Sequence, residues 1–327
     1  MDTLAITRGG RWWLPVALLV LLAAFALGVM VGPAGSWGSA TWRIVWNVRL
    51  PRVVLAGVVG SMLSLAGASY QGVFRNPLVD PYLLGVAAGA GLGATIVFAL
   101  GRSATANWPV DPLPLAAFVG GLLAVLLTYL VGSSFGGNRN GITLVLAGVA
   151  VTSLATAVQA FVLQRNNDVI REVYSWILGR LTTANWGDVT LVLPYVLASS
   201  VVLLLHRRHL DVLRVGDEEA AALGTDVPRV RLAVVVAATM GTAAVVSVSG
   251  LIGFVGIVVP HAVRMMAGAS YRRLLPLSLI VGAAFLILAD IPGRVLQNPA
   301  ETPIGVVTAF FGAPFFIIVL RTRRVPA

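Results

Sequence analysis

The sequence contains no cysteine and no lysine, and each absence excludes a class of chemistry. Without cysteine, the chain cannot form a disulfide, a thiolate nucleophile or a zinc site with cysteine ligands. Without lysine, it lacks both the phosphate-binding residue of a Walker-type ATPase and the amine needed for Schiff-base chemistry. All 23 basic residues are therefore arginines. The chain cannot hydrolyse ATP by the Walker route.

Charged residues are also scarce. They make up 11% of the chain, whereas roughly a quarter of the residues in an average soluble protein are charged. Hydrophobic residues make up 58%, and the mean hydropathy is +0.90. These values predict an all-α polytopic membrane protein, and the unbroken apolar runs argue against a transmembrane β-barrel. The net charge of +10 does not indicate a nucleic-acid partner, because the arginines are scattered between apolar spans.

Windows without charge predict where the chain crosses the membrane. There are nine, at residues 12–31, 53–74, 81–101, 112–138, 140–164, 189–205, 232–260, 274–289 and 302–320. The window at 232–260 is longer than the roughly 20 residues that span a bilayer, so we divide it at Gly250, which gives ten helices. The first window resembles a signal peptide, but its length and the many spans after it favour a retained helix.

The distribution of arginines predicts the topology. Ten spans place both termini on one side, together with 15 of the 23 arginines, including Arg8, Arg11, Arg321, Arg323 and Arg324. The positive-inside rule makes that side cytoplasmic. Nine spans would send the C-terminal arginines outside. We therefore predict a multi-pass protein of the cytoplasmic membrane, with residues 1–327 forming a single transmembrane domain.

The densest run of ionisable residues, 207–229, lies between predicted helices six and seven. Asp217-Glu218-Glu219 is typical of the first turn of a short helix, with Leu223 closing its apolar face and Gly224 ending it. Asp226 is a plausible N-cap for the next helix. The stretch could be a rigid projection that a partner pushes on, or a solvated loop; these residues alone leave both open.

Arg49, Arg52 and Arg294 are among the arginines that lie on the predicted outer side, against the usual bias. They could be interfacial side chains that snorkel to water, or they could form a site. Asp290 ends a span and is paired in sequence with Arg294.

Six segments carry a resemblance to a known family. They are Arg49–Ala94, Trp176–Gly179, Val215–Asp226, Gly250–Gly268, Ala289–Arg294 and Glu301–Phe316. In sequence and order these segments resemble the permeases of iron-chelate, haem and cobalamin ABC importers, the FecCD family. The resemblance covers nearly all of the chain beyond the first helix.

This resemblance implies ten transmembrane helices and a transport role without catalytic residues, metal site or cofactor in this chain. It also implies three kinds of partner: a second permease subunit (the same chain or a close homologue), two cytoplasmic ATPase subunits that hold ATP and magnesium, and an extracytoplasmic binding protein.

The resemblance also assigns site residues. It implies that Arg49, Arg52 and Arg294 pair with glutamates of the binding protein. It places the ATPase-coupling helices at Asp217, Glu218, Glu219, Ala220, Ala221, Leu223 and Gly224. On the fifth predicted helix, a polar stripe with helical spacing fits the translocation path, although its hydroxyls could simply bond to their own backbone. That stripe is Gly148, Thr152, Thr156 and Gln159.

The substrate is predicted only as a class. Ferric siderophore is the commonest role in the family, and haem and cobalamin are the alternatives. No cluster of His, Asp and Glu stands where a bare metal ion would enter, so a metal is expected to arrive already chelated. An ion-coupled secondary transporter would be expected to carry ionisable groups at membrane depth, and an intramembrane enzyme would need a catalytic constellation; neither is visible.

Overall fold

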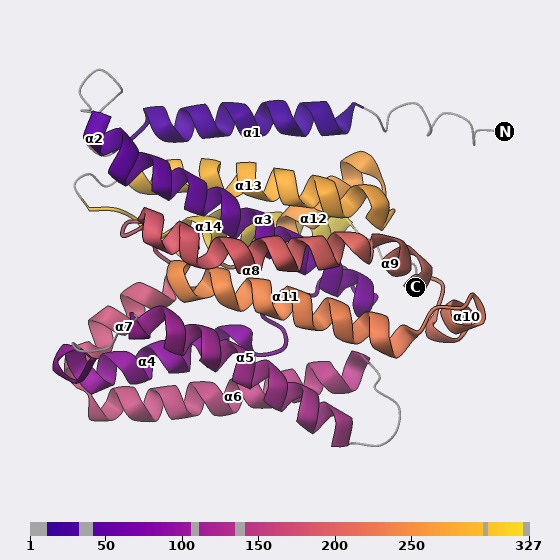
Figure 1. The fold of residues 1–327 in the computed structure, drawn as a ribbon, viewed down its shortest axis with the longest axis horizontal. Helices are drawn as coiled ribbons and strands as arrows, with labels where there is room; N and C mark the ends of the chain where they lie inside the picture. Colours follow the sequence, from indigo (N-terminus) through magenta and orange to yellow (C-terminus); the bar gives the residue numbers. More distant parts are fainter. Residues whose placement is uncertain (1–11, 33–41, 106–110, 135–140, 297–299, 323–327) are drawn as a thin grey trace.

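The computed structural model describes residues 12–32, 42–105, 111–134, 141–296 and 300–322 (Figure 1). Four of the five arginines named in the topology argument, Arg8, Arg11, Arg323 and Arg324, lie outside the described residues, as does Arg139. The helices are α1 (Trp13–Met30), α2 (Trp42–Ile44), α3 (Leu50–Val73), α4 (Val86–Thr105), α5 (Pro112–Ser134), α6 (Gly141–Arg165), α7 (Ile170–Ile177), α8 (Trp186–Leu205), α9 (Arg207–Leu213), α10 (Asp217–Ala222), α11 (Val227–Ser249), α12 (Val255–Ala267), α13 (Tyr271–Val295) and α14 (Ile304–Thr322).

The prediction of an all-α polytopic membrane protein is confirmed. In the described part of the chain, seven helices are long and apolar enough to cross a membrane, and three shorter apolar helices accompany them at Val86–Gly101, Val255–Ala267 and Ile304–Val319. Each predicted window overlaps one of these helices, apart from the divided window, which overlaps two. The main difference lies at the third window, where α4 begins at Val86 and residues 81–85 form turns instead.

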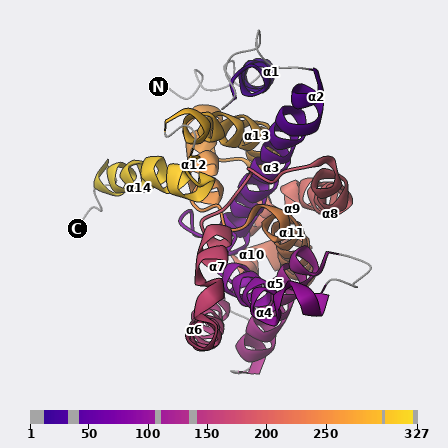
Figure 2. The same cartoon turned by 90° about the vertical axis from the view of Figure 1, so that its left-hand side faces the viewer.

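Helix α3 lies at the centre of the bundle. It packs against α13, α11, α12 and α8, while α4, α5 and α6 form a second group that contacts α11 (Figure 2). Burial follows this arrangement: 78% of the apolar window containing α3 is buried, against 22% for α1 at the periphery. The helix is continuous with a π-helical segment, Val45–Arg49, so Arg49 and Arg52 belong to a helix and not to a loop.

Glycines allow the central helices to touch. A Cβ added to Gly60 of α3 would lie 2.2 Å from the carbonyl oxygen of Gly282 in α13, and one added to Gly282 would lie 2.4 Å from Gly60 O. Small residues at a crossing let the backbones of membrane helices approach closely. At Gly60 and Gly282, α3 and α13 therefore touch through their backbones.

The division predicted at Gly250 is present. α11 ends at Ser249, Gly250 has φ +68°, and α12 begins at Val255. A positive φ favours glycine, and a break inside an apolar window is tolerated where the backbone is covered by protein. The break separates two helices that the apolar pattern alone would have joined.

Candidate functional site

One end of the bundle holds a buried ion cluster formed by Arg52 of α3 and by Asp290 and Arg294 of α13. Arg52 donates from Nε to Asp290 Oδ2 and from Nη2 to Oδ1, each at 2.8 Å. Arg294 donates to Oδ2 of the same carboxylate, from Nε at 2.7 Å and also from Nη2. The three side chains are at most 8% exposed. One buried carboxylate thus serves two guanidiniums.

Glu301, in the segment before α14, supplies a second carboxylate. Its Oε2 lies 2.7 Å from Nη1 of Arg52, and its side chain is 18% exposed. Two carboxylates then face Arg52 and Arg294, which brings the cluster close to neutrality. Glu301 is also the edge of the cluster nearest to solvent.

The same end of the bundle fixes the last turn of α1. Arg49 Nη1 donates to Met30 O at 3.0 Å, and Arg294 Nη1 donates to Gly28 O at 2.8 Å. Carbonyls at a helix C-terminus lack partners within the helix and carry the negative end of its dipole. These arginines therefore tie the peripheral helix α1 to α3 and α13.

All three arginines that the resemblance assigns to docking are thus buried in this chain, with 3% of Arg49, 7% of Arg52 and 1% of Arg294 exposed. Snorkelling does not describe them, because their guanidiniums donate to protein groups inside the bundle. The sequence indicated the pairing of Asp290 with Arg294 from their spacing of four. It gave no sign of the Arg52–Asp290 contact, because those residues are 238 positions apart.

At the opposite end, the charged stretch 207–229 is held at two points; we call it the coupling segment, after the role that the resemblance implies for it. Asp211 of α9 accepts hydrogen bonds from Tyr271 N–H and Ser270 Oγ, both at 2.8 Å, which anchors α9 to the start of α13. Asp217 of α10 lies 3.0 Å from Arg231 Nη2 and 3.4 Å from Arg75 Nη2. The segment is therefore a fixed projection and not a loosely solvated loop.

The structure predicted for the coupling segment is confirmed except at one residue. α10 runs from Asp217 to Ala222, Gly224 has φ +83°, and Asp226 caps α11 by accepting from Arg229 N–H at 3.1 Å. The expectation that Leu223 closes the apolar face of α10 is wrong, since Leu223 is 70% exposed. A helix of six residues makes too little contact: Ala220 is its buried residue, and Leu223 lies just past its end.

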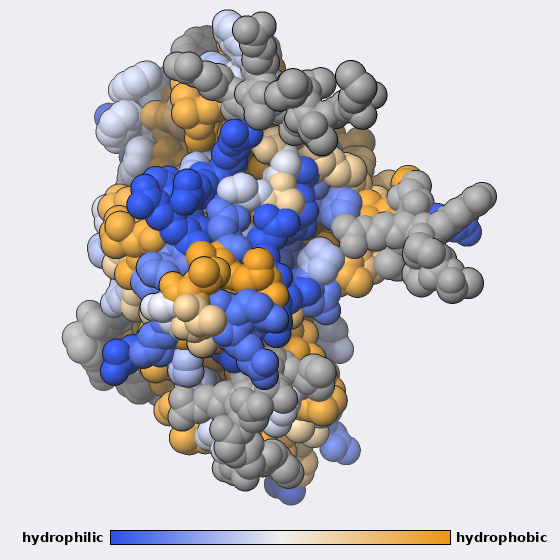
Figure 3. Space-filling view, turned by 90° about the vertical axis from the view of Figure 1, so that its right-hand side faces the viewer, coloured by the Kyte–Doolittle hydropathy of each residue, from blue (hydrophilic) through white to orange (hydrophobic). Residues whose placement is uncertain are grey.

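This exposure gives the coupling segment a surface suited to a protein partner. Ala221, Leu223 and Gly224 are exposed, and so are the acidic Glu218 and Glu219. Figure 3 shows this end of the molecule, with apolar residues gathered in the middle of the face and hydrophilic residues around them. An apolar centre with a charged rim is the usual arrangement of a protein interface.

The polar stripe predicted for the path lies on α6 but does not face one way. Gly148 packs against the connection before α4, since a Cβ there would lie 2.4 Å from Leu83 O. Gln159 is buried, and its Nε2 donates to Thr95 Oγ1 of α4 at 2.9 Å. Thr152 is half-buried and Thr156 is exposed. The stripe therefore runs from the α4–α6 contact to the surface.

The connection between α3 and α4 is joined to the Gly250 break by Tyr82. Its hydroxyl donates to Ile252 O and accepts from Ile252 N–H, each at 3.1 Å. Beside it, Asp80 Oδ1 accepts from Tyr82 N–H at 2.8 Å. Asp80 is only half-buried as a residue, yet surrounding protein desolvates its carboxyl and raises its pKa to about 6, against that hydrogen bond. The sequence did not signal this junction.

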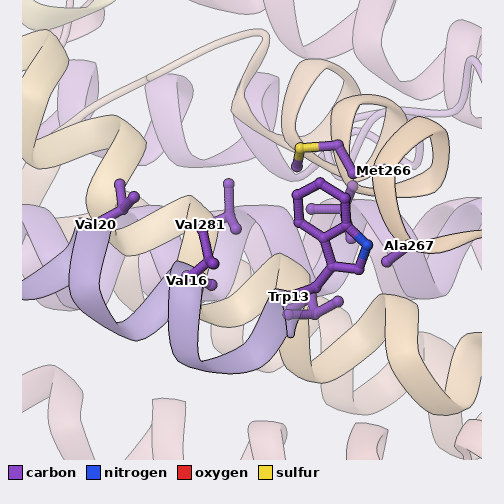
Figure 4. Close-up of a pocket in the computed structure, with 9 residues that line it drawn as sticks. Trp13, Val16, Val20, Met266, Ala267 and Val281 are labelled. Carbon is purple, nitrogen blue, oxygen red and sulfur yellow. The ribbon is translucent and has the colours of Figure 1, made fainter. Parts of the chain in front are cut away.

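An apolar groove lies between α1, α12 and α13, near the start of α1. It is lined by residues such as Trp13, Met266, Leu277 and Val281, and Figure 4 shows Trp13 beside Met266. It opens on the outside of the bundle, where lipid would meet a membrane protein. Its lining offers little to orient a chelate, so we do not assign it to transport.

Metal-binding groups do not gather in the described residues: no three His, Asp or Glu side chains lie close enough to hold an ion. His261 is buried beside the ring of Phe315, with centroids 5.8 Å apart.

Comparison with known proteins bears on this arrangement. The FecCD transport family matches residues 13–322. The chain belongs to this family. As an FecCD protein it is a multi-pass permease subunit of an ABC importer in the inner membrane, and it is not an enzyme.

Individual relatives of this FecCD permease differ in their cargo. It is 43% identical to the cobalamin import system permease protein BtuC of Halobacterium salinarum, over 98% of this chain and 83% of the relative. It is 37% identical to the hemin transport system permease protein HmuU of Yersinia pestis, over 94% and 95%. It is 32% identical to the Fe(3+) dicitrate permease protein FecC of Escherichia coli, over 95% and 97%.

The FecCD fold is also found among solved structures. One is described as an inward-facing conformation of a metal-chelate type ABC transporter, and it matches with a TM-score of 0.86 and 29% identity, over 94% of this chain and 98% of that one. Permeases of this family work with a separate ATPase, which binds the nucleotide, and with a second permease.

Proposed function

We propose that this permease moves a ferric siderophore across the cytoplasmic membrane by alternating access. The observation that carries the proposal is the fixed coupling segment, on a chain that matches importer permeases over nearly its whole length. Relatives named for ferric dicitrate and ferric enterobactin transport support an iron chelate as cargo.

Cobalamin is the second candidate, and the relative at 43% identity favours it. Haem is a third, supported by the hemin permease at 37%. All three cargoes are bulky chelates. A path lined by small and weakly polar groups suits such a molecule, because it can pass without being held. We assign Gly148, Thr152, Thr156 and Gln159 to that path, with Thr156 as its exposed member.

The proposed topology has ten spans in a single permease domain, residues 1–327, with both termini in the cytoplasm. Seven long and three shorter apolar helices in the described residues support that number. α1 begins at the end of the bundle where α9 and α10 lie (Figure 1), which agrees with a cytoplasmic N-terminus beside the coupling segment.

The proposed assembly contains two permease subunits, two ATPase subunits and one extracytoplasmic binding protein. ATP and magnesium are held by the ATPases. ATP binding closes the ATPase pair, and this movement reaches the permease through residues 217–224. The anchors of Asp211 and Asp217 then carry it to α13, α11 and the end of α3.

Uptake into proteoliposomes tests the function. The vesicles contain this chain, its ATPase and its binding protein, and each receives ferric siderophore, haem or cobalamin with or without internal ATP. ATP-dependent accumulation of one chelate identifies the cargo. Uptake driven by a proton gradient without ATP would contradict the proposal.

Leu223→Asp tests the coupling surface. We expect it to weaken binding of the ATPase by roughly thirtyfold and to abolish uptake, since a charge in the apolar centre of an interface removes a contact of about 2 kcal/mol or more. Leu296→Asp is the matched control, because Leu296 is 73% exposed at the opposite end of the bundle. Equal ATPase affinity for the two variants would refute the assignment.

Arg49, Arg52 and Arg294 are proposed as the docking site of the binding protein, through an exchange of partners. Their guanidiniums are occupied in this chain, and the accessible edge is the Arg52–Glu301 pair. A glutamate of the binding protein would displace Glu301 from Arg52 Nη1. Arginine holds a carboxylate bidentately, so the exchange would preserve charge and geometry.

Two substitutions separate docking from a purely structural role. Arg52→Gln should lower the affinity for the binding protein by roughly ten- to a hundredfold, which corresponds to one charge-assisted hydrogen bond. Glu301→Gln should raise it severalfold at low salt, because the competing carboxylate is gone. Arg43→Gln, an exposed change on α2, should leave it unchanged. If Glu301→Gln lowers the affinity instead, the exchange does not occur.

A further inference from the structure

Beside α10 lies a pocket of about 260 Å³ whose wall contains three arginines. Arg75 follows α3, Arg214 follows α9, and Arg264 belongs to α12, so three separate segments bring their charges to one place. Gln71 and Tyr271 contribute polar groups to the same wall. The transport role assigned above uses the contact of Arg75 with Asp217 but gives this pocket no ligand.

Positive charge dominates the pocket. Arg75 lies 3.4 Å from Asp217, a carboxylate that is 3.0 Å from Arg231 as well. Arg214 lies 3.8 Å from Asp211, whose two oxygens already accept from Ser270 and Tyr271. Charge-assisted hydrogen bonds are usually about 2.7–2.9 Å long, so neither pairing is tight. The side chains of Arg75 and Arg214 are 45% and 49% exposed, which makes them accessible to a ligand.

The third arginine is fixed in position. Arg264 Nη2 donates to Gln71 Oε1 at 2.8 Å, and Gln71 Nε2 donates to Gly256 O at 3.0 Å. This chain of hydrogen bonds joins the end of α3 to α12. Arg264 is therefore preorganised on one face of the pocket. Arg75 and Arg214 are held less tightly, by Asp217 and Asp211.

The backbone at Arg75 is strained. Its φ is +49°, a left-handed conformation that residues other than glycine rarely adopt. Such strain is concentrated at ligand clamps and switch regions. At Arg75 it places a cation in the wall of the pocket, 3.4 Å from Asp217 of α10.

We infer that this pocket binds a phosphate group. Guanidiniums hold phosphate bidentately, and three of them around one cavity match its charge and its several acceptor oxygens. The group could come from free phosphate or from the headgroup of an anionic phospholipid. Occupancy would draw Arg75 away from Asp217 and so loosen one of the two ion pairs that hold α10. The inference goes beyond the proposed transport function and does not depend on it.

Calorimetric titration of the purified full-length chain in detergent tests the site, with inorganic phosphate as the probe and chloride at equal ionic strength as the reference. We expect saturable binding of phosphate that weakens at least tenfold in Arg75→Gln combined with Arg214→Gln. Arg229→Gln is the matched control: its side chain is 87% exposed at the same end, outside the pocket, and the variant should bind like the original chain. Because Arg75, Arg214 and Arg229 are exposed, the variants should fold, and thermal unfolding without phosphate verifies this.

Nanodiscs distinguish the two possible sources of the phosphate group, free phosphate and a lipid headgroup. If phosphatidylglycerol suppresses phosphate binding relative to phosphatidylcholine, the headgroup of an anionic lipid occupies the pocket; if it does not, the site takes soluble phosphate. Either result supports the inference. Phosphate binding that matches chloride, or that survives in the double variant, overturns it whatever the outcome of the uptake assay.

Discussion

Replacement of Asp290 by Asn is expected to lower the free energy of unfolding by about 3–5 kcal/mol, because it leaves buried charges without their counterion. Asn has nearly the same shape, so the change removes charge and leaves packing intact. Arg52 would keep its ion pair with Glu301, whereas Arg294 would lose its ion pair with Asp290 and keep neutral acceptors, among them the carbonyls of Gly28 and Val31. Thermal or denaturant unfolding of the purified chain in detergent measures the loss.

The matched control is Asp226→Asn. Asp226 also pairs with an arginine, but that arginine is 87% exposed, and exposed ion pairs contribute about 0–1 kcal/mol. Asn also remains a good N-cap for α11. If the two variants unfold alike, the cluster at Asp290 contributes no more than a surface pair, and the structural account of the buried end is wrong.

Substitution of Gly60 by Ala should be the second large effect. The new methyl group would lie 2.2 Å from Gly282 O, which is closer than two non-bonded atoms can approach. α3 and α13 must therefore separate. Overpacking of this kind typically costs about 1–3 kcal/mol, and a crossing made by backbone cannot relax by turning a side chain. The same unfolding assay detects it.

Gly57→Ala is its control on the same helix, three residues earlier. A Cβ there would have its nearest neighbour at 3.4 Å, the flexible end of Ile287. Alanine favours helix over glycine by about 1 kcal/mol, so this variant should be neutral or slightly stabilised. A loss at Gly57 as large as that at Gly60 would mean that the close crossing is not what matters.

Local features of this fold could be predicted from the sequence because their causes are local. The division at Gly250 follows from a window too long for one bilayer crossing, and the bounds of α10 follow from its acidic first turn and Gly224. The exposure of Leu223 could not be predicted in this way. Whether a short helix covers its last apolar side chain depends on what packs against it.

Contacts between residues that are far apart in the sequence could not be predicted from it. Arg52 and Asp290 are 238 positions apart, and no pattern in the chain indicates that they meet. Helix α7 was missed because Arg171 and Glu172 interrupt its apolar residues, although Val173 and Trp176 are buried. The stripe on α6 was found by its spacing, but only the position of α4 decides that Gln159 turns inward.

The contact between Gly60 and Gly282 limits how this molecule can move. With two backbones touching, α3 and α13 cannot slide along each other, and the arginines at the end of α1 make that helix travel with them. These three helices therefore move as one rigid body. We expect the relative movement inside the permease to take place between this rigid body and the α4–α6 group, which residues 74–85 connect to α3.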